Sequence, residues 1–128
     1  MTEAWFEEWV RKAEEDYLVA SSLDANTTPS AVCFHCQQCV EKYLKAALAK
    51  QGGPIRKIRN LTVLNDLVAE QDARFEKLHD ELGSLNPYSV VGRYPGSEPS
   101  IDEARRALDM ASSLRRQMRD LLGLRAEG

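Results

Sequence analysis

The 128-residue sequence has no hydrophobic run long enough to span a bilayer, and acidic residues interrupt the apolar runs near its start. A membrane helix needs about 20 consecutive apolar residues, and a signal peptide needs an uninterrupted apolar core. We therefore expect no membrane segment and no signal peptide. The sequence also lacks internal repeats, low-complexity tracts and segments that alternate apolar and polar residues, so we expect no strands.

Cysteine is scarce as well. The three cysteines, Cys33, Cys36 and Cys39, are an odd number within the most apolar stretch and suggest no disulfide framework. Reduced thiols fit the cytoplasm, which is the location we expect. A helix would project these side chains along a line, so we interpret them as small packing residues and expect no metal, iron–sulfur cluster or other cofactor. The net charge of −3 argues against a protein that coats polyanions.

The stretch from Ala31 to Ala49 is apolar around more of its circumference than a surface helix requires. Such a helix needs several neighbours to cover it, so we expect it to be the central helix of the fold. Thr28 and Pro29 supply an N-cap and a proline at the first helical position, and residues 52–54 end the helix with two glycines and a proline. The length predicts one domain covering residues 1–128.

An amphipathic first helix is indicated by apolar residues at steps of three and four from Trp5 to Leu23. Its aromatic residues, Trp5, Phe6 and Trp9, are expected in the core, and any exposed member of this cluster would suit a dimer or partner interface. Short polar residues that compete with the helical backbone are predicted to end this helix near Asp24.

The second half of the chain predicts short helices, a loop and a final helix. Asn60 and Asp72 are placed to cap two short helices or two parts of one kinked helix. Residues 86–99 contain three prolines and two glycines and are expected to form a long loop that is functional or mobile. Ser100 and Glu103 form a capping box before the last apolar stripe. The whole pattern predicts an all-α, up-and-down bundle of four to five helices.

The order and spacing of these elements resemble the HEPN domain family over nearly the whole chain. The most specific motifs are the pattern Gln37-Gln38, Glu41-Lys42 and Leu44-Lys45-Ala46 on the central helix and Arg93-Tyr94-Pro95 in the loop. The resemblance implies a bundle that is usually a homodimer and is associated with nucleotide or RNA binding. It also implies a minimal nucleotidyltransferase as partner, and some branches of the family are ribonucleases or toxins.

The nuclease branches carry an arginine followed a few residues later by a histidine, with two copies assembled across the dimer. Arg74 and His79 match that bare spacing, but Phe75 and Glu81 replace a polar residue and a tyrosine of the pattern. On one helix, residues this far apart would be separated by about 140°. A ribonuclease toxin that uses Arg74 and His79 across a homodimer is therefore the alternative function, and a solvated helix face is the structural alternative.

Charged residues on a helix that is otherwise buried are expected to be paired or to line a groove. We interpret them as one wall of a polar groove between the central helix and the loop, where lysines and an arginine meet a phosphate and a tyrosine stacks on a base. In the structural alternative, Arg93 pairs with Glu41 and holds the loop to the bundle. The candidate ligand-binding residues are Gln38, Glu41, Lys42, Lys45, Arg93 and Tyr94.

The sequence predicts a non-catalytic module that binds nucleotide or RNA and works with a minimal nucleotidyltransferase. The last helix offers a second basic surface, because Arg105, Arg116 and Arg119 can fall near one side and face RNA or an acidic partner. Acidic neighbours dilute that stripe, so we favour a mixed, solvated helix surface there.

Overall fold

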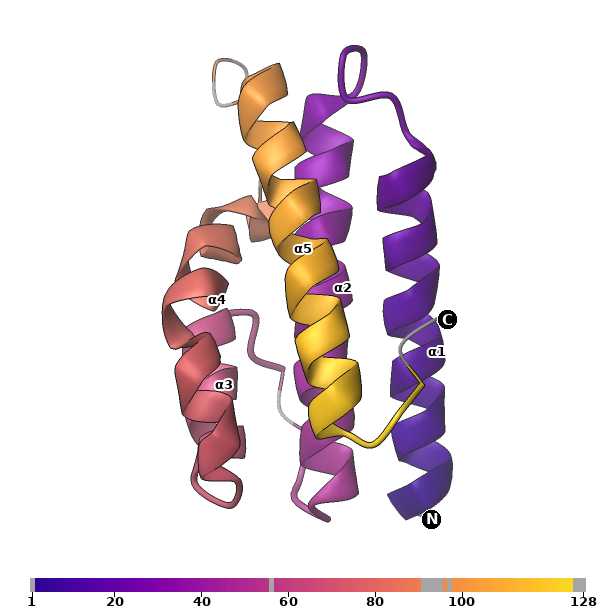
Figure 1. Ribbon diagram of the computed structural model, residues 1–128, viewed down its shortest axis with the longest axis vertical. Coiled ribbons are helices and arrows are strands. Elements are labelled where there is room, and N and C mark those ends of the chain that lie inside the picture. Colours follow the sequence, from indigo (N-terminus) through magenta and orange to yellow (C-terminus); the bar gives the residue numbers. More distant parts are fainter. Residues whose placement is uncertain (1, 56, 91–95, 97, 126–128) are drawn as a thin grey trace.

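The computed structural model describes residues 2–55, 57–90, 96 and 98–125. This part of the chain contains five α-helices and two short 3-10 helices and no strand, which confirms the predicted all-α, up-and-down bundle (Figure 1). The elements are α1 (Thr2–Ser22), α2 (Pro29–Lys50), α3 (Leu61–Ala69), η1 (Ala73–Leu78), α4 (His79–Leu85), η2 (Asn86–Val90) and α5 (Ile101–Leu121).

The helix α2 occupies the centre, as its wide apolar surface predicts. It packs against α1, α3, α4, α5 and η2, and Tyr43 and Leu44 on it are fully buried. Figure 1 shows α1 on one side of α2, the α3 and α4 layer on the other, and α5 running along the front. The core is continuous across these elements, and Phe75 of η1 and Met118 of α5 belong to the same buried cluster.

Three of the predicted caps are present. The side chain of Asn60 accepts hydrogen bonds from the first turn of α3, and that of Asp72 accepts one from the first turn of η1. Ser100 and Glu103 form the complete capping box of α5, with both reciprocal bonds at 3.0 Å. These bonds satisfy amide groups that a helix start otherwise leaves without partners, so the sequence signals at these ends are local and reliable.

The start of α2 differs in one detail. The helix begins at Pro29, as predicted, but Thr28 makes no capping hydrogen bond with its side chain. Its hydroxyl instead donates to the carbonyl of Asp24 at 2.8 Å, which closes the turn after α1. The predicted cap was wrong because this backbone acceptor competes for the hydroxyl. The other end of α2 follows the prediction, since Gly52 has a φ of 79°, in the left-handed region that favours glycine.

The first residues of the predicted loop 86–99 form regular secondary structure. Asn86–Val90 forms the 3-10 helix η2, so its first residues were wrongly predicted to be irregular. The side chain of Asn86 accepts a hydrogen bond from the backbone amide of Leu61 at 2.6 Å, which fixes η2 against the start of α3. Pro87 is the second residue of η2, and a proline in the first turn is compatible with a short helical segment.

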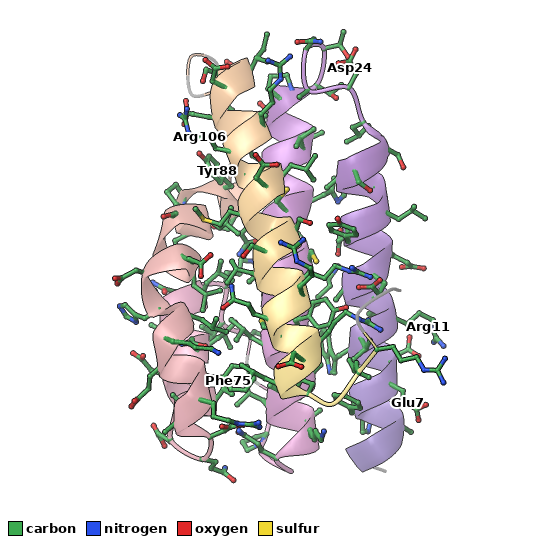
Figure 2. All side chains as sticks on the ribbon, in the orientation of Figure 1. Glu7, Arg11, Asp24, Phe75, Tyr88 and Arg106 are labelled. Carbon is green, nitrogen blue, oxygen red and sulfur yellow. The ribbon has the colours of Figure 1, made fainter. Side chains whose placement is uncertain are left out.

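One face of α1 lies against α2, with Ala13 and Ala20 fully buried and Trp9 half-buried. Trp5 is 56% exposed, so its predicted place in the core was wrong. The reason is angular, because Trp5 lies about 80° around the helix from Ala13. Arg11 projects away from the bundle (Figure 2).

Within the described ranges, we find no helix with the length and apolar character needed to cross a membrane.

Candidate functional site

Two groups of hydrogen-bonded polar side chains lie on α2. In the first group, Asp16 of α1 accepts a hydrogen bond of 2.8 Å from Nδ1 of His35 and another from Nζ of Lys42. Asp16 is buried, whereas the side chains of His35 and Lys42 are 29% and 25% exposed. One buried carboxylate therefore holds two nitrogen-bearing side chains at the edge of the solvent.

The second group is centred on Glu41, which is buried. Lys45 donates to one of its oxygens at 2.9 Å, and Gln37 and Gln38 donate to the other at 3.2 and 3.3 Å. Gln37 also donates to the backbone carbonyl of Arg59, which ties α2 to the segment before α3. A buried charge is costly unless it is paired and hydrogen-bonded, and Glu41 and Lys45 meet that condition.

The two groups differ in what they offer a ligand. Lys45 is committed to Glu41, and its Nζ lies 5.6 Å from the ring centroid of Trp9, where a cation is favoured. The side chains of Lys42 and His35 in the first group are partly exposed, and so is Gln38 in the second. Because an ammonium group has three hydrogen-bond donors, the bond from Lys42 to Asp16 leaves two donors for a phosphate or another anion.

Four of the six predicted ligand-binding residues lie on α2, where Lys42 belongs to the first group and Gln38, Glu41 and Lys45 belong to the second. The remaining two, Arg93 and Tyr94, lie outside the described residues. The groove between α2 and the loop therefore stays a prediction, and so does the alternative ion pair between Arg93 and Glu41.

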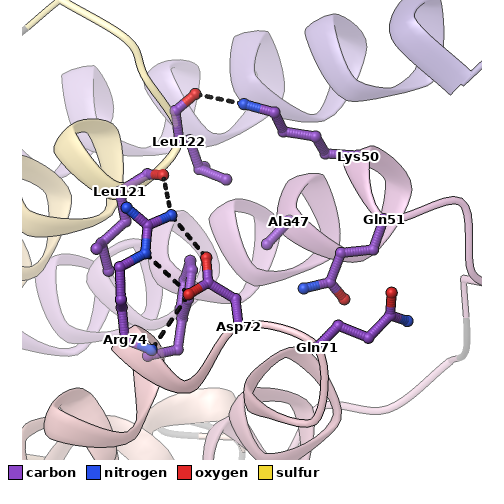
Figure 3. A pocket seen from close by; sticks show the side chains of 9 residues that line it. Ala47, Lys50, Gln51, Gln71, Asp72, Arg74, Leu121 and Leu122 are labelled. Carbon is purple, nitrogen blue, oxygen red and sulfur yellow. Dashed lines mark hydrogen bonds and ion pairs between the residues drawn. The ribbon is translucent and has the colours of Figure 1, made fainter.

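Arg74 and His79 contact different parts of the fold. Arg74 of η1 donates two hydrogen bonds to Asp72, at 2.9 and 2.7 Å, and a third to the carbonyl of Leu121 at 3.2 Å (Figure 3). His79 begins α4, and its Nδ1 lies 3.7 Å from a carboxylate oxygen of Asp66 on α3. Both side chains are exposed, and each is directed to its own acidic neighbour.

The family model described as the HEPN domain matches residues 6–121. The chain belongs to the HEPN domain family. A curated relative from Methanocaldococcus jannaschii, named "Putative toxin MJ1304", is 36% identical over 102 residues, which cover 74% of this chain and 65% of that protein. The chain thus spans slightly less than two thirds of that relative's length. No solved structure matches the sequence.

Sequence reasoning missed a polar network inside this HEPN domain, between α1, α2 and α5. Arg115 of α5 donates twice to Glu14 of α1, and Tyr43 of α2 donates to the same carboxylate. Burial raises the pKa of Glu14, but the hydrogen bonds from Arg115 and Tyr43 outweigh it and keep the pKa below its ordinary value of 4.5. Burial, followed by the bond to Glu14, raises the pKa of Tyr43.

Arg119 belongs to the same network. It donates to the hydroxyl of Tyr43 at 2.9 Å, and one of its terminal nitrogens lies 3.6 Å from Glu14. Arg119 is buried, so its predicted place on a solvated surface was wrong. Arg105 and Arg116 are exposed, as expected. Arg119 also donates to the backbone carbonyl of Arg125, just after α5. The pattern of α5 carries no signal for the burial of Arg119, because Tyr43 and Glu14 come from other helices.

The three cysteines of this HEPN domain are free and buried. Burial raises the pKa of Cys33 to about 11 and that of Cys36 to about 12, and burial also raises the pKa of Cys39. Among the residues that the structure describes, no cluster of three or more histidine, cysteine or acidic side chains has a geometry that fits a metal ion.

Proposed function

We propose that this HEPN domain binds nucleotide or RNA without cleaving it and works in the cytoplasm, as a homodimer, with a minimal nucleotidyltransferase partner. One observation carries the binding part of this proposal. Lys42 and His35 share the carboxylate of Asp16 and keep part of their surface in solvent. The carboxylate of Asp16 holds the ammonium group of Lys42 in place. Little side-chain freedom is therefore lost when a phosphate binds this ammonium group.

The absence of cleavage is inferred from the positions of Arg74 and His79. Cleavage of RNA without a metal needs a base, an acid and a cation that converge on one phosphate. The guanidinium of Arg74 is engaged by Asp72 and by the end of α5, whereas His79 is oriented toward Asp66 of α3. Each of these two side chains is thus held by a different acidic residue, which argues against a shared phosphate position within one chain.

A second candidate function is a ribonuclease toxin in which Arg74 and His79 act across a homodimer. The printed name of the Methanocaldococcus relative favours it, because that protein is named a toxin. In this case a second copy of the chain would supply a second Arg74 and His79 to a shared site. Degradation of RNA by the purified protein, lost in His79→Ala, would establish this candidate in place of the first.

The binding proposal is tested by a series of variants at Lys42. The affinity of the purified protein for a fluorescent single-stranded RNA is measured by anisotropy at low and moderate salt. Lys42→Ala is expected to weaken binding by about tenfold, the effect of one lost charge-assisted hydrogen bond, and Lys42→Arg is expected to retain most of the affinity. The exposed Lys77 of η1 provides the matched control, Lys77→Ala. Equal losses in both alanine variants would indicate general charge attraction and contradict a site at Lys42.

The partner and the homodimer are tested together by mass. The chain is expressed together with the reading frames encoded beside it, and a purification tag is placed on only one of the proteins. The mass of the purified complex is then measured by native mass spectrometry. We expect two copies of this chain, together with a nucleotidyltransferase. A monomer that recovers no neighbour would contradict this part of the proposal without affecting the RNA measurement.

A further inference from the structure

The imidazole of His35 has its two nitrogens in different environments. Nδ1 lies 2.8 Å from one carboxylate oxygen of Asp16, and Lys42 donates to the other oxygen of the same carboxylate. A carboxylate that receives a donor at each oxygen only accepts hydrogen bonds, so the proton of the neutral imidazole is assigned to Nδ1. Nε2 of the neutral ring then keeps its lone pair and is a hydrogen-bond acceptor.

Nε2 of His35 is also within reach of a ligand. The side chain of His35 is 29% exposed, and Nε2 has no hydrogen-bond partner among the described residues. The buried side-chain nitrogen and oxygen atoms without a partner belong to Ser30, Gln51 and Asn65, and Nε2 of His35 is not one of them. An atom that has no partner and is not buried contacts solvent, so this acceptor is open.

Lys42 places a cation beside this acceptor. His35 and Lys42 stand about two turns apart on one side of α2, and the single carboxylate of Asp16 holds both. The ammonium group of Lys42 keeps further donors for an anion. The surface therefore presents a fixed positive charge and a fixed acceptor together. The matching ligand has an anionic group close to a hydrogen-bond donor.

A ribose phosphate unit has this arrangement, because the 2′-hydroxyl stands on the carbon next to the one that bears the 3′-phosphate. The hydroxyl can donate a hydrogen bond, whereas the sugar of DNA has no donor at that position. We propose that His35 determines sugar specificity, with its Nε2 accepting a hydrogen bond from the 2′-hydroxyl of the nucleotide whose phosphate contacts Lys42. This inference rests on the proposed function in taking RNA as the ligand, and it adds the residue that selects RNA over DNA.

An acceptor at the 2′-hydroxyl is one of the groups that RNA cleavage requires, but cleavage also needs an acid at the leaving oxygen. The second histidine, His79, lies on α4 and is oriented toward Asp66. On α2, Lys42 contacts the phosphate in the proposed arrangement, and Lys45 is committed to Glu41. The hydrogen bond to His35 therefore recognises the sugar and leaves the RNA intact.

The first test compares the affinities of the purified chain for oligonucleotides of one sequence by fluorescence anisotropy. The probes are RNA, its 2′-fluoro analogue, which keeps a ribose-like sugar conformation without the donor, and DNA. At about pH 8 histidine side chains are ordinarily neutral. We expect RNA to bind about three- to tenfold more tightly than the other two probes, the effect of one hydrogen bond.

His35→Asn separates the proposed contact from the structural role of His35, which joins α2 to α1. The amide nitrogen of asparagine can take the place of Nδ1 and donate to Asp16, whereas nothing replaces Nε2. We expect this variant to bind RNA as weakly as the 2′-fluoro analogue. The exposed Lys77 again supplies the control, since Lys77→Ala should keep the preference for RNA. A preference that His35→Asn retains would overturn the inference and leave His35 with the structural role alone.

A second measurement uses the native chain and does not depend on whether a variant folds. The protein has two histidines, so nitrogen-15 spectra of the labelled protein can separate their ring resonances. We expect His35 to be protonated at Nδ1, and its Nε2 resonance to shift when RNA is added but not when the 2′-fluoro analogue is added. A proton on Nε2, or a resonance that RNA leaves unchanged, would contradict the inference.

The outcomes distinguish this inference from the function on which it rests. Equal affinities for RNA and the 2′-fluoro analogue, both lowered in Lys42→Ala, would overturn the role of His35 and leave the proposed function intact. Loss of RNA binding that depends on Lys42 would overturn the proposed function and the inference together. RNA that the native chain shortens and His35→Asn spares would also overturn the inference, because His35 would then remove the proton of the hydroxyl.

Discussion

Arg115 and Glu14 join two helices that otherwise touch little. Nε of Arg115 donates to one carboxylate oxygen at 2.8 Å, and a terminal nitrogen donates to the other at 2.7 Å. Arg115 also lies over the ring of Tyr17, with 4.6 Å between its guanidinium carbon and the ring centroid. Because α1 and α5 each pack mainly on α2, this paired contact fixes their relative position.

Removing Arg115 is therefore expected to destabilise the fold. Arg115→Ala leaves Glu14 with a partly buried charge and one partner fewer, and we expect the free energy of unfolding to fall by about 2 to 3 kcal/mol. Urea denaturation followed by circular dichroism measures this change. The neighbouring Arg116→Ala is the matched control, since Arg116 is exposed and its change should stay within about 0.5 kcal/mol. Equal losses in the two variants would contradict the assigned role.

The same contact predicts how stability depends on pH. The pKa of Glu14 is lowered in the folded protein, where burial opposes the shift and the bonds from Arg115 and Tyr43 outweigh it. A carboxyl group with a depressed folded pKa stabilises the fold above its unfolded pKa, and this stabilisation is lost as the pH falls through the folded value. Between about pH 5 and about pH 3, the native chain should thus lose more stability than Glu14→Gln. Denaturation curves with the same pH slope for both proteins would refute this expectation.

The buried cysteines predict slow thiol chemistry. The pKa of Cys33 is raised to about 11 by burial, compared with an ordinary value of 9.0. At pH 8 the thiolate fraction is then about 100-fold lower than that of an unfolded thiol, and access is restricted as well. Reaction with an aromatic disulfide reagent should be at least about 100-fold slower in native protein than in urea. A reaction as fast in the native state as in urea would show that the thiols are accessible.

The central helix and three of the four predicted caps were predictable because their signals are local. The apolar width of Ala31–Ala49 indicates a helix enclosed by others, and Ser100 with Glu103 indicates a helix start within four residues of sequence. Neither inference requires knowledge of which distant segments become neighbours.

The buried network was not predictable for the opposite reason. Arg115 and Arg119 stand beside the apolar stripe of α5, a position where arginine is commonly solvated. Only the fold brings Glu14 from α1 and Tyr43 from α2 to the same place.

The capping box offers a sharp comparison between two helix starts. Ser100→Ala removes a side-chain acceptor for the α5 amide of Glu103 and should cost about 1 kcal/mol of stability. Thr28→Ala at the start of α2 removes only the hydroxyl bond to Asp24 in an exposed turn, and we expect a smaller loss. Thermal unfolding of the two variants beside the native chain measures the difference. A larger loss for Thr28→Ala would be inconsistent with the observed bonding.

Incubation of labelled single-stranded RNA with the purified chain at neutral pH, without added metal, tests the central claim most directly. One half of each sample is run on a native gel, and the other half on a denaturing gel. We predict that the RNA is shifted yet full-length, and that Lys42→Ala loses the shift whereas Lys77→Ala and Lys42→Arg keep it. RNA that is shortened by the native chain and spared by His79→Ala would contradict the account.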